Sequence, residues 1–159
     1  ARVGAICRLG DGQLVAIAEV GGAVVYALSD DDGITWSSTS SLTSGVAPAA
    51  CLLYPSNDLL VAYADAVDVE EYGTVYARHC AWDGAAYTAG DVVTVHAWGT
   101  AVPSRRINCV EGVMQLITGE LAVYHSGATL SSGYGQSYYP ILSQSSDGGQ
   151  TWIPYPNPS

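Results

Sequence analysis

Three consecutive aspartates, Asp30, Asp31 and Asp32, form the densest group of carboxylates in the sequence. Carboxylate oxygens are ligands that Ca²⁺ prefers, so a calcium loop is the first chemistry to consider. An EF-hand loop alternates its oxygen ligands, carries glycine at position six and ends on glutamate at position twelve. If Asp30 is position one, position six is Thr35 and position twelve is Ser41. We therefore expect no metal site here.

The same segment, SDDDGITW (29–36), has a second version in SSDGGQTW (145–152), and both fit the pattern SxDxGxTW. Serine and aspartate oxygens can accept hydrogen bonds from backbone N–H groups in a tight turn, and glycine supplies a positive φ. The tryptophan can cover the hairpin and bury a large apolar face. The pattern therefore predicts two structural turns, formed by Ser29, Asp31, Gly33, Thr35 and Trp36 and by Ser145, Asp147, Gly149, Thr151 and Trp152.

Two other stretches carry side chains that could contact a ligand. DAVDVEEYG (65–73) contains Asp65 and Asp68, which form either a solvated acidic rim or a polar contact set for sugar hydroxyls or a divalent cation. SGATLSSGYGQSYYP (126–140) is rich in Ser, Gly and Tyr, the mixture found in recognition loops. Tyr134 could stack on the face of a sugar, whereas the tyrosines at 138 and 139 could equally pack within a strand.

The sequence lacks the residue patterns for nucleophilic catalysis, phosphate binding and zinc binding. The histidines at 79, 96 and 125 lie in different parts of the chain, and none is paired with a serine or cysteine at a nucleophile turn. No glycine-rich loop that could hold a phosphate is present. The four cysteines (7, 51, 80 and 109) include no CxxC pair, which argues against a zinc knuckle. We expect buried free thiols, with a disulfide left open, and no cofactor.

The composition indicates a globular chain and excludes some partners. Of 159 residues 48% are hydrophobic and 13% charged, all five basic residues are arginines, and the formal net charge is −10. This negative field disfavours nucleic acid and acidic membrane surfaces. No apolar run approaches the roughly 18–20 residues that span a bilayer. The chain begins at Ala1 without a methionine or signal peptide, so we expect a processed chain or a piece of a longer one.

An internal repeat predicts how these residues are positioned. Three segments each read as strand, tight turn and strand: 6–20, 51–65 and 113–127. A third strand follows in each unit, at 23–29, 73–80 and 138–145, and a fourth is expected, for instance at 91–98. Four strands per unit at this spacing are typical of the blades of a β-propeller.

The two SxDxGxTW segments resemble the Asp-box (BNR) repeat of sialidase-like propellers. The middle unit has AWDGAAY (81–87), which keeps an Asp-Gly turn and an aromatic residue but lacks the serine and threonine. The resemblance implies an all-β propeller segment over 1–153, with blades of four antiparallel strands at about 1–45, 46–98 and 99–153, followed by a Pro-rich tail or linker at 154–159. It also places the box between the third and fourth strands, away from the ligand face. Three blades make an incomplete ring or part of a larger six- or seven-bladed propeller.

Glycan-processing members of that family begin the first inner strand with an Arg-Ile-Pro signature whose arginine holds a substrate carboxylate. Arg2 in ARVGAICRL and Arg106 in SRRINC match the arginine, although neither stretch keeps the proline. Each could pair bidentately with a carboxylate or form a salt bridge at a strand end. The short turn AEVGGAV (18–24) offers only Glu19 as an acid. A retaining glycosidase needs two carboxyl groups about 5 Å apart, and no such pair is evident.

The leading hypothesis is a non-catalytic, sialidase-like propeller that recognises glycans through Arg2, Arg106, Asp65, Asp68 and Tyr134. We expect an extracellular or virion-surface setting, as in cell attachment by a phage appendage. The expected partners are a glycan and further blades, from the same chain or a homo-oligomer, without nucleic acid or membrane insertion. The alternatives are an exo-glycosidase whose catalytic residues lie outside this segment and a structural assembly module that contacts only protein.

Overall fold

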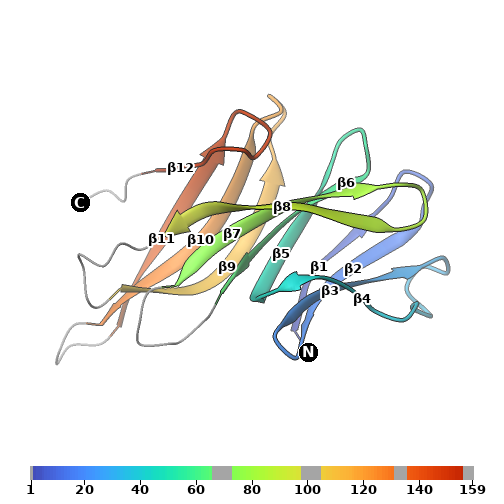
Figure 1. Cartoon of the computed structure of the whole chain (residues 1–159), viewed down its shortest axis with the longest axis horizontal. Helices are drawn as coiled ribbons and strands as arrows, with labels where there is room; N and C mark the ends of the chain where they lie inside the picture. The colour runs from blue at the N-terminus through green and yellow to red at the C-terminus, as the bar shows by residue number, and fades with distance from the viewer. Residues whose placement is uncertain (1, 66–72, 98–104, 131–135, 156–159) are drawn as a thin grey trace.

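The computed structural model describes residues 2–65, 73–97, 105–130 and 136–155, and for 105–109, 128–130 and 136–139 we describe the backbone alone. Over these residues the strands form three four-stranded antiparallel sheets (Figure 1). The all-β prediction with four strands per unit is therefore confirmed. No helix in this part of the chain is long and apolar enough to cross a membrane.

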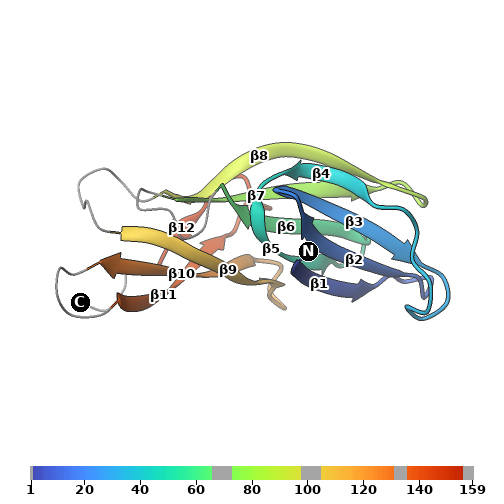
Figure 2. The same ribbon diagram turned by 90° about the horizontal axis from the view of Figure 1, so that it is seen from below.

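The strands of each sheet follow one another along the chain and in space. Sheet 1 contains β1 (Arg2–Arg8), β2 (Leu14–Val20), β3 (Ala23–Ser29) and β4 (Ser40–Ser44). Sheet 2 contains β5 (Val46–Leu53), β6 (Asp58–Ala64), β7 (Thr74–Trp82) and β8 (Tyr87–Ala97). Sheet 3 contains β9 (Arg105–Gln115), β10 (Leu121–Leu130), β11 (Gln136–Ser145) and β12 (Ile153–Pro154). Figure 2 shows the sheets side by side, with sheet 2 in the middle.

The first hairpin of sheets 1 and 3 uses the same turn. In sheet 1, Leu9 N donates to Gln13 O (2.8 Å) and Gly12 N to Leu9 O (3.0 Å). In sheet 3, Leu116 N donates to Glu120 O (2.7 Å) and Gly119 N to Leu116 O (2.9 Å). Gly12 and Gly119 adopt φ of 96° and 90°, values that glycine reaches without steric cost. The repeat read from the sequence thus extends to backbone hydrogen bonds.

Strand register gives every sheet two distinct faces. On the face that we call upstream, the second strand presents Leu14 in sheet 1, Leu59 in sheet 2 and Leu121 in sheet 3, opposite Ser29, Cys80 and Ser145 of the third strand. The next residue along each second strand points to the opposite face, which we call downstream, because side chains alternate along a strand. The downstream residues at this position are Val15, Leu60 and Ala122.

Two apolar cores join the three sheets. The first lies between the downstream face of sheet 1 and the upstream face of sheet 2 and includes Val15, Ile17, Leu59 and Val61. The second lies between the downstream face of sheet 2 and the upstream face of sheet 3, and it includes Leu60, Ala62, Leu121 and Val123. The upstream face of sheet 1 and the downstream face of sheet 3 are therefore the two outer faces of the described stack.

Thiols on the first strands show that these strands run in the same direction. Burial raises the pKa of Cys7, and a hydrogen bond from the Leu52 backbone on β5 opposes this rise. Burial also raises the pKa of Cys51 to about 12, with a smaller contribution from Cys7 and an opposing hydrogen bond from the Gln115 backbone on β9. The late parts of β1, β5 and β9 thus lie beside one another, and all three strands begin at the opposite end.

We call the end at which β1, β5 and β9 begin the entry end, and the other the turn end. The second strand of each sheet finishes at the entry end, near Glu19 and Ala64. The third strand finishes at the turn end, so both SxDxGxTW segments lie there, between the third and fourth strands of their sheets. Pro154, within the segment expected as a tail, belongs to β12, and Tyr155 N donates to Leu142 O (2.7 Å).

Candidate functional site

The two SxDxGxTW segments form the same hydrogen-bond network. In the first, Ser29 Oγ donates to Asp31 Oδ1 (2.8 Å) and accepts from Gly33 N (2.9 Å). Thr35 donates its N–H to Asp31 Oδ1 (2.8 Å) and its hydroxyl to Asp31 Oδ2 (2.6 Å). Trp36 Nε1 donates to Gly33 O (3.0 Å). Every patterned side chain therefore has a partner inside its own turn.

The second segment repeats these contacts within 0.1 Å. Ser145 Oγ donates to Asp147 Oδ1 (2.7 Å) and accepts from Gly149 N (2.8 Å). Thr151 donates through its N–H (2.9 Å) and its hydroxyl (2.6 Å) to Asp147, and Trp152 Nε1 donates to Gly149 O (3.0 Å). This identity supports a structural role for both segments.

The aspartates of these turns are held in the charged form. Hydrogen bonds from the Thr35 side chain and backbone, with a further one from Ser29, lower the pKa of Asp31. The corresponding bonds from Thr151 and Ser145 lower the pKa of Asp147. A general acid needs a raised pKa, so neither carboxyl group is suited to protonate a leaving group near neutral pH.

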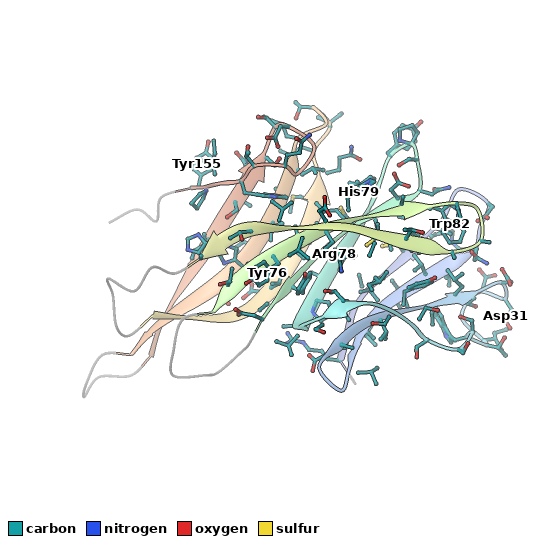
Figure 3. All side chains as sticks on the ribbon, in the orientation of Figure 1. Asp31, Tyr76, Arg78, His79, Trp82 and Tyr155 are labelled. Carbon is teal, nitrogen blue, oxygen red and sulfur yellow. The ribbon has the colours of Figure 1, made fainter. Side chains whose placement is uncertain are left out.

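The three consecutive aspartates that suggested a metal loop contact different partners. Asp30 Oδ1 accepts from Gln13 Nε2 (2.6 Å), whereas Asp32 Oδ1 pairs with Arg8 (2.8 Å). Asp31 is bound within the turn, as described above. Figure 3 shows Asp31 at the tip of sheet 1. Across the described residues, no group of three or more His, Cys, Asp or Glu side chains could hold a metal ion.

The middle unit builds a different turn, and a cysteine occupies the place of the serine. Cys80 pairs with Leu59 as Ser29 pairs with Leu14. Asp83 Oδ1 accepts from Ala85 N (2.9 Å) and Ala86 N (2.8 Å), and these bonds lower its pKa. The Asp-Gly turn expected at 81–87 is therefore a short hairpin between β7 and β8.

The two tryptophans differ in burial, although their turns are alike. Trp152 packs against the second core, beside Leu121 of its own sheet and near Leu60 of sheet 2. Trp36 is 38% exposed, so it buries less of its face than the sequence pattern suggested. The cause is positional, because Trp36 lies toward the upstream face of sheet 1, which no other described sheet covers.

Two of the five predicted ligand-binding residues can be placed with their side chains, and both lie at the entry end. Arg2 is exposed and lies opposite Glu19 in the register of β1 and β2. Asp65 is exposed and accepts from Thr74 N (2.8 Å), which joins the two sides of the β6–β7 connection. Arg106 has a described backbone near the start of β9, opposite Ala128, and Asp68 and Tyr134 lie outside the described residues.

The entry end also contains groups that the sequence pattern did not single out as ligands. Glu19 Oε2 accepts from Ala47 N (3.1 Å), which connects sheet 1 to sheet 2. Ala47 has a φ of 49°, a conformation that alanine adopts only with strain and that occurs often at functional sites. The signal for Glu19 was present in the sequence, since it is the acid of the short β2–β3 turn.

A tyrosine pair lies near the same end. The rings of Tyr63 and Tyr76 have centroids 5.8 Å apart, and Thr43 Oγ1 donates to the Tyr63 hydroxyl (3.3 Å). Tyr63 is buried, whereas Tyr76 is only partly covered and is labelled in Figure 3. Arg2, Glu19, Asp65 and Tyr76 thus give the entry end a cation, two carboxylates and an aromatic ring.

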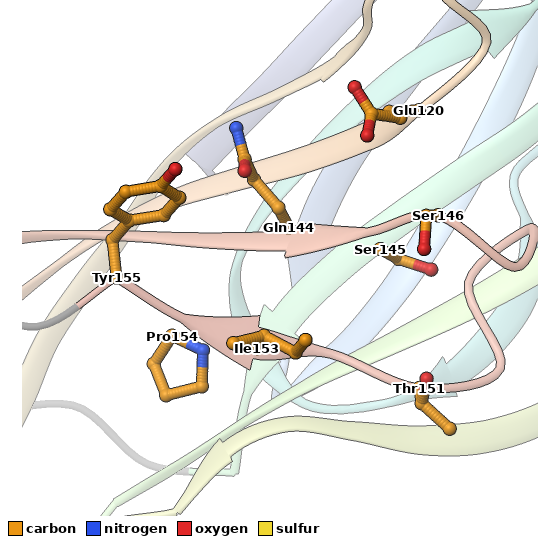
Figure 4. A pocket seen from close by; sticks show the side chains of 8 residues that line it. All are labelled: Glu120, Gln144, Ser145, Ser146, Thr151, Ile153, Pro154 and Tyr155. Carbon is orange, nitrogen blue, oxygen red and sulfur yellow. The ribbon is translucent and has the colours of Figure 1, made fainter.

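A groove of about 320 Å³ lies elsewhere, on the downstream side of sheet 3 near the turn end (Figure 4). Its lining includes Glu120, Gln144, Ile153 and Tyr155. Neither Arg2 nor Asp65, the two predicted ligand-binding residues with described side chains, lines this groove.

Comparison with solved structures identifies the class of fold. The three sheets superpose on the α-L-arabinanase of Penicillium chrysogenum solved with arabinobiose, with a TM-score of 0.64 and 19% identity over 96% of this chain and 48% of that one. They also superpose on a protein of unknown function from Dyadobacter fermentans, with a TM-score of 0.56 and 16% identity over 93% of this chain and 48% of that one. A polysaccharide lyase, an ulvan lyase bound to a GlcA–Rha3S fragment, gives a TM-score of 0.50 and 12% identity over 96% and 42%.

These matches define a β-propeller type of fold, of which the chain supplies three four-stranded sheets. The chain spans less than half the length of each of these three structures. No protein-family model and no curated protein matches the sequence.

Proposed function

We propose that this chain binds carbohydrate at the entry end of its sheets without cleaving it. The observation that carries the proposal is its structural likeness to two glycan-active propeller enzymes, each solved with a saccharide. The entry end has suitable chemistry, because Arg2 can pair with a sugar carboxylate and Asp65 can accept from hydroxyl groups. Arg106, Asp68 and Tyr134 are proposed as further contacts. The two SxDxGxTW turns are proposed to be Asp-boxes that brace sheets 1 and 3.

Two described carboxylates of the entry end argue for binding rather than hydrolysis. Glu19 accepts a hydrogen bond from the backbone of Ala47, and Asp65 accepts one from the backbone of Thr74. Each of these carboxylates is therefore already used to hold a neighbouring stretch of backbone. The proposed setting is extracellular or on a virion surface, where an acidic, lysine-free chain would act in cell attachment.

A glycan array with the purified chain tests this proposal, followed by calorimetric titration of the best saccharide. We expect Arg2→Ala and Asp65→Ala each to weaken binding at least about tenfold, the loss of one or two charge-assisted hydrogen bonds. Asp91→Ala is the matched control for Asp65→Ala, since Asp91 is an exposed aspartate in the middle of β8.

Two outcomes would replace the proposal. Turnover of a fluorogenic glycoside, abolished by Arg2→Ala, would favour an exo-glycosidase. An array without hits at high protein concentration would favour a module that contacts only protein.

A further inference from the structure

The interface between sheets 2 and 3 shows where an SxDxGxTW turn packs. A Cβ built on Gly149 would lie 3.5 Å from Leu121, 3.7 Å from Trp152 and 4.0 Å from Leu60 of sheet 2. Leu60 is on the downstream face of sheet 2, where it pairs with His79. The turn of one sheet therefore contacts the downstream face of the sheet before it.

The groove on sheet 3 occupies the equivalent position. Ala122 pairs with Gln144 in sheet 3 as Leu60 pairs with His79 in sheet 2, and Gln144 lines the groove. Figure 4 shows Gln144, Ile153 and Tyr155 around this groove. Ile153 is 71% exposed and Tyr155 is 59% exposed. The groove is thus exposed on sheet 3, whereas the equivalent position on sheet 2 is covered by the SxDxGxTW turn of the next sheet.

The first SxDxGxTW turn has apolar side chains and no described sheet to cover them. Ile34 is 83% exposed, and Trp36 lies beside it in the same turn. Val3 and Ile6 are also exposed, and their pairing with Ala18 and Ala16 places them on the upstream face of sheet 1. Exposed large apolar side chains therefore occur both in this turn and on the uncovered face of the same sheet, and such exposure is typical of interaction surfaces.

We propose that two copies of this chain associate head to tail, so that the first SxDxGxTW turn of each copy lies in the sheet 3 groove of the other. Both interior junctions join a downstream face to an upstream face, and among the described sheets the one remaining face of each kind belongs to the same chain. A second copy supplies both missing faces at once. Six sheets are within the four to eight that close a propeller, and the matched structures are about twice as long as this chain.

Charge adds a directional contact to this junction. At the interior junction, Gln115, which pairs with Leu121, accepts from Tyr54 N (2.7 Å) in the first hairpin of sheet 2. Arg8 lies opposite Leu14 in the same way, on the side of sheet 1 where the first hairpin of a packed sheet would lie, and its guanidinium donates to Asp32 Oδ1 and Gly12 O, both at 2.8 Å. In the proposed dimer that hairpin belongs to sheet 3 and carries Glu120. Arg8 of one copy and Glu120 of the other therefore place opposite charges on the two sides of the junction.

Light scattering and native mass spectrometry test the proposal on the 159-residue chain. At about 100 μM, well above the micromolar Kd that a standard-sized interface commonly reaches, we expect twice the chain mass of 16.5 kDa. Ile153→Glu, an exposed position in the groove, should weaken association at least about tenfold. Val92→Glu is the matched control, because Val92 is 48% exposed on sheet 2, whose two faces are already covered.

A charge exchange between Arg8 and Glu120 distinguishes the specific junction from nonspecific hydrophobic association. Arg8→Glu and Glu120→Arg should each weaken the dimer, and the double variant should restore it by at least about half of the lost free energy of association. A monomeric chain at this concentration, or open-ended oligomers in place of a dimer, would overturn the proposal. Equal weakening by Ile153→Glu and Val92→Glu would do the same. None of these measurements depends on glycan binding.

Discussion

At the scale of single residues, the aspartates of the two SxDxGxTW turns show how a carboxylate can be structural although it looks catalytic. Each accepts both hydrogen bonds that one threonine can donate, through the threonine N–H and its hydroxyl. The charge of the aspartate is therefore used to hold the turn closed. A substrate that approached this carboxylate would have to compete with donors fixed by the backbone.

His125 is fully buried on β10, with its Nε2 3.4 Å from Ser143 Oγ and its ring centroid 5.2 Å from that of His96. Burial, and then the neighbouring His96, lower the pKa of His125 from 6.5 to about 3. In the unfolded chain this histidine takes up a proton near pH 6.5, whereas in the folded chain it stays neutral until about pH 3. Stability that is present above pH 6.5 is therefore lost as the pH falls through this window.

We predict that the free energy of unfolding decreases between pH 6.5 and pH 3, with a slope of at most about 1.4 kcal/mol per pH unit from His125. Urea titrations at a series of pH values measure this slope. It should become shallower in His125→Gln and remain in His79→Gln, since His79 is exposed and pairs with Asp58 at 3.0 Å. An unchanged slope in His125→Gln would show that other groups cause the acid sensitivity.

The side chains also show which parts of the candidate site could be predicted. The glycine, serine and threonine positions of the turns could be read from the sequence because their partners lie within eight residues. The burial of Trp36 and Trp152 could not, because it depends on whether a neighbouring sheet covers each turn. The pairing of Glu19 with Ala47 also depends on how sheets 1 and 2 meet.

At the scale of elements, β1 and β5 approach one another closely near the entry end. A Cβ at Gly4 would overlap the Pro48 carbonyl oxygen, so only glycine fits at this crossing. Both strands have an irregular register here, between Val3 and Ala5 and between Val46 and Ala49. Such bulges redirect side chains and are common beside binding sites.

We predict that Gly4→Ala lowers the free energy of unfolding by about 1–3 kcal/mol, because the added methyl group must push the two strands apart. Chemical denaturation followed by circular dichroism measures the change. Gly112→Ala is the matched control on β9, where a Cβ would meet nothing within 4 Å, and we expect a change within about 0.5 kcal/mol. Similar losses in the two variants would contradict the close-approach explanation.

The strands themselves were predictable to different degrees, for physical reasons. β3 begins and ends where the alternation of apolar residues indicated. β8 begins at Tyr87, earlier than the expected strand at 91–98, because Tyr87 packs edge-on against Tyr26 of sheet 1 at 5.3 Å and donates its hydroxyl to Asn57 O. The contact with Tyr26 joins two sheets, and the contact with Asn57 joins β8 to the β5–β6 turn of its own sheet. Local propensity encodes neither of them.

At the scale of the whole molecule, sheet 2 is the only described sheet with neighbours on both faces. We predict that backbone amides of β6 and β7 exchange most slowly with deuterium, because opening them requires both cores to separate. Exchange measured by mass spectrometry checks this order, and the Ile153→Glu variant offers a comparison with the outer faces left open. Slowest exchange in β2 or β10 would contradict it.

Consecutive strand order has a consequence for biosynthesis. Because every sheet is assembled from hairpins adjacent in the chain, sheet 1 can form once residue 44 has left the ribosome, before any of sheet 3 has been translated. The nascent sheet would then expose Val15, Ile17 and Val24 until sheet 2 arrives to cover them. Slow translation through 46–82 would prolong that exposure, so codon choice in this stretch of the gene should influence the yield of folded protein.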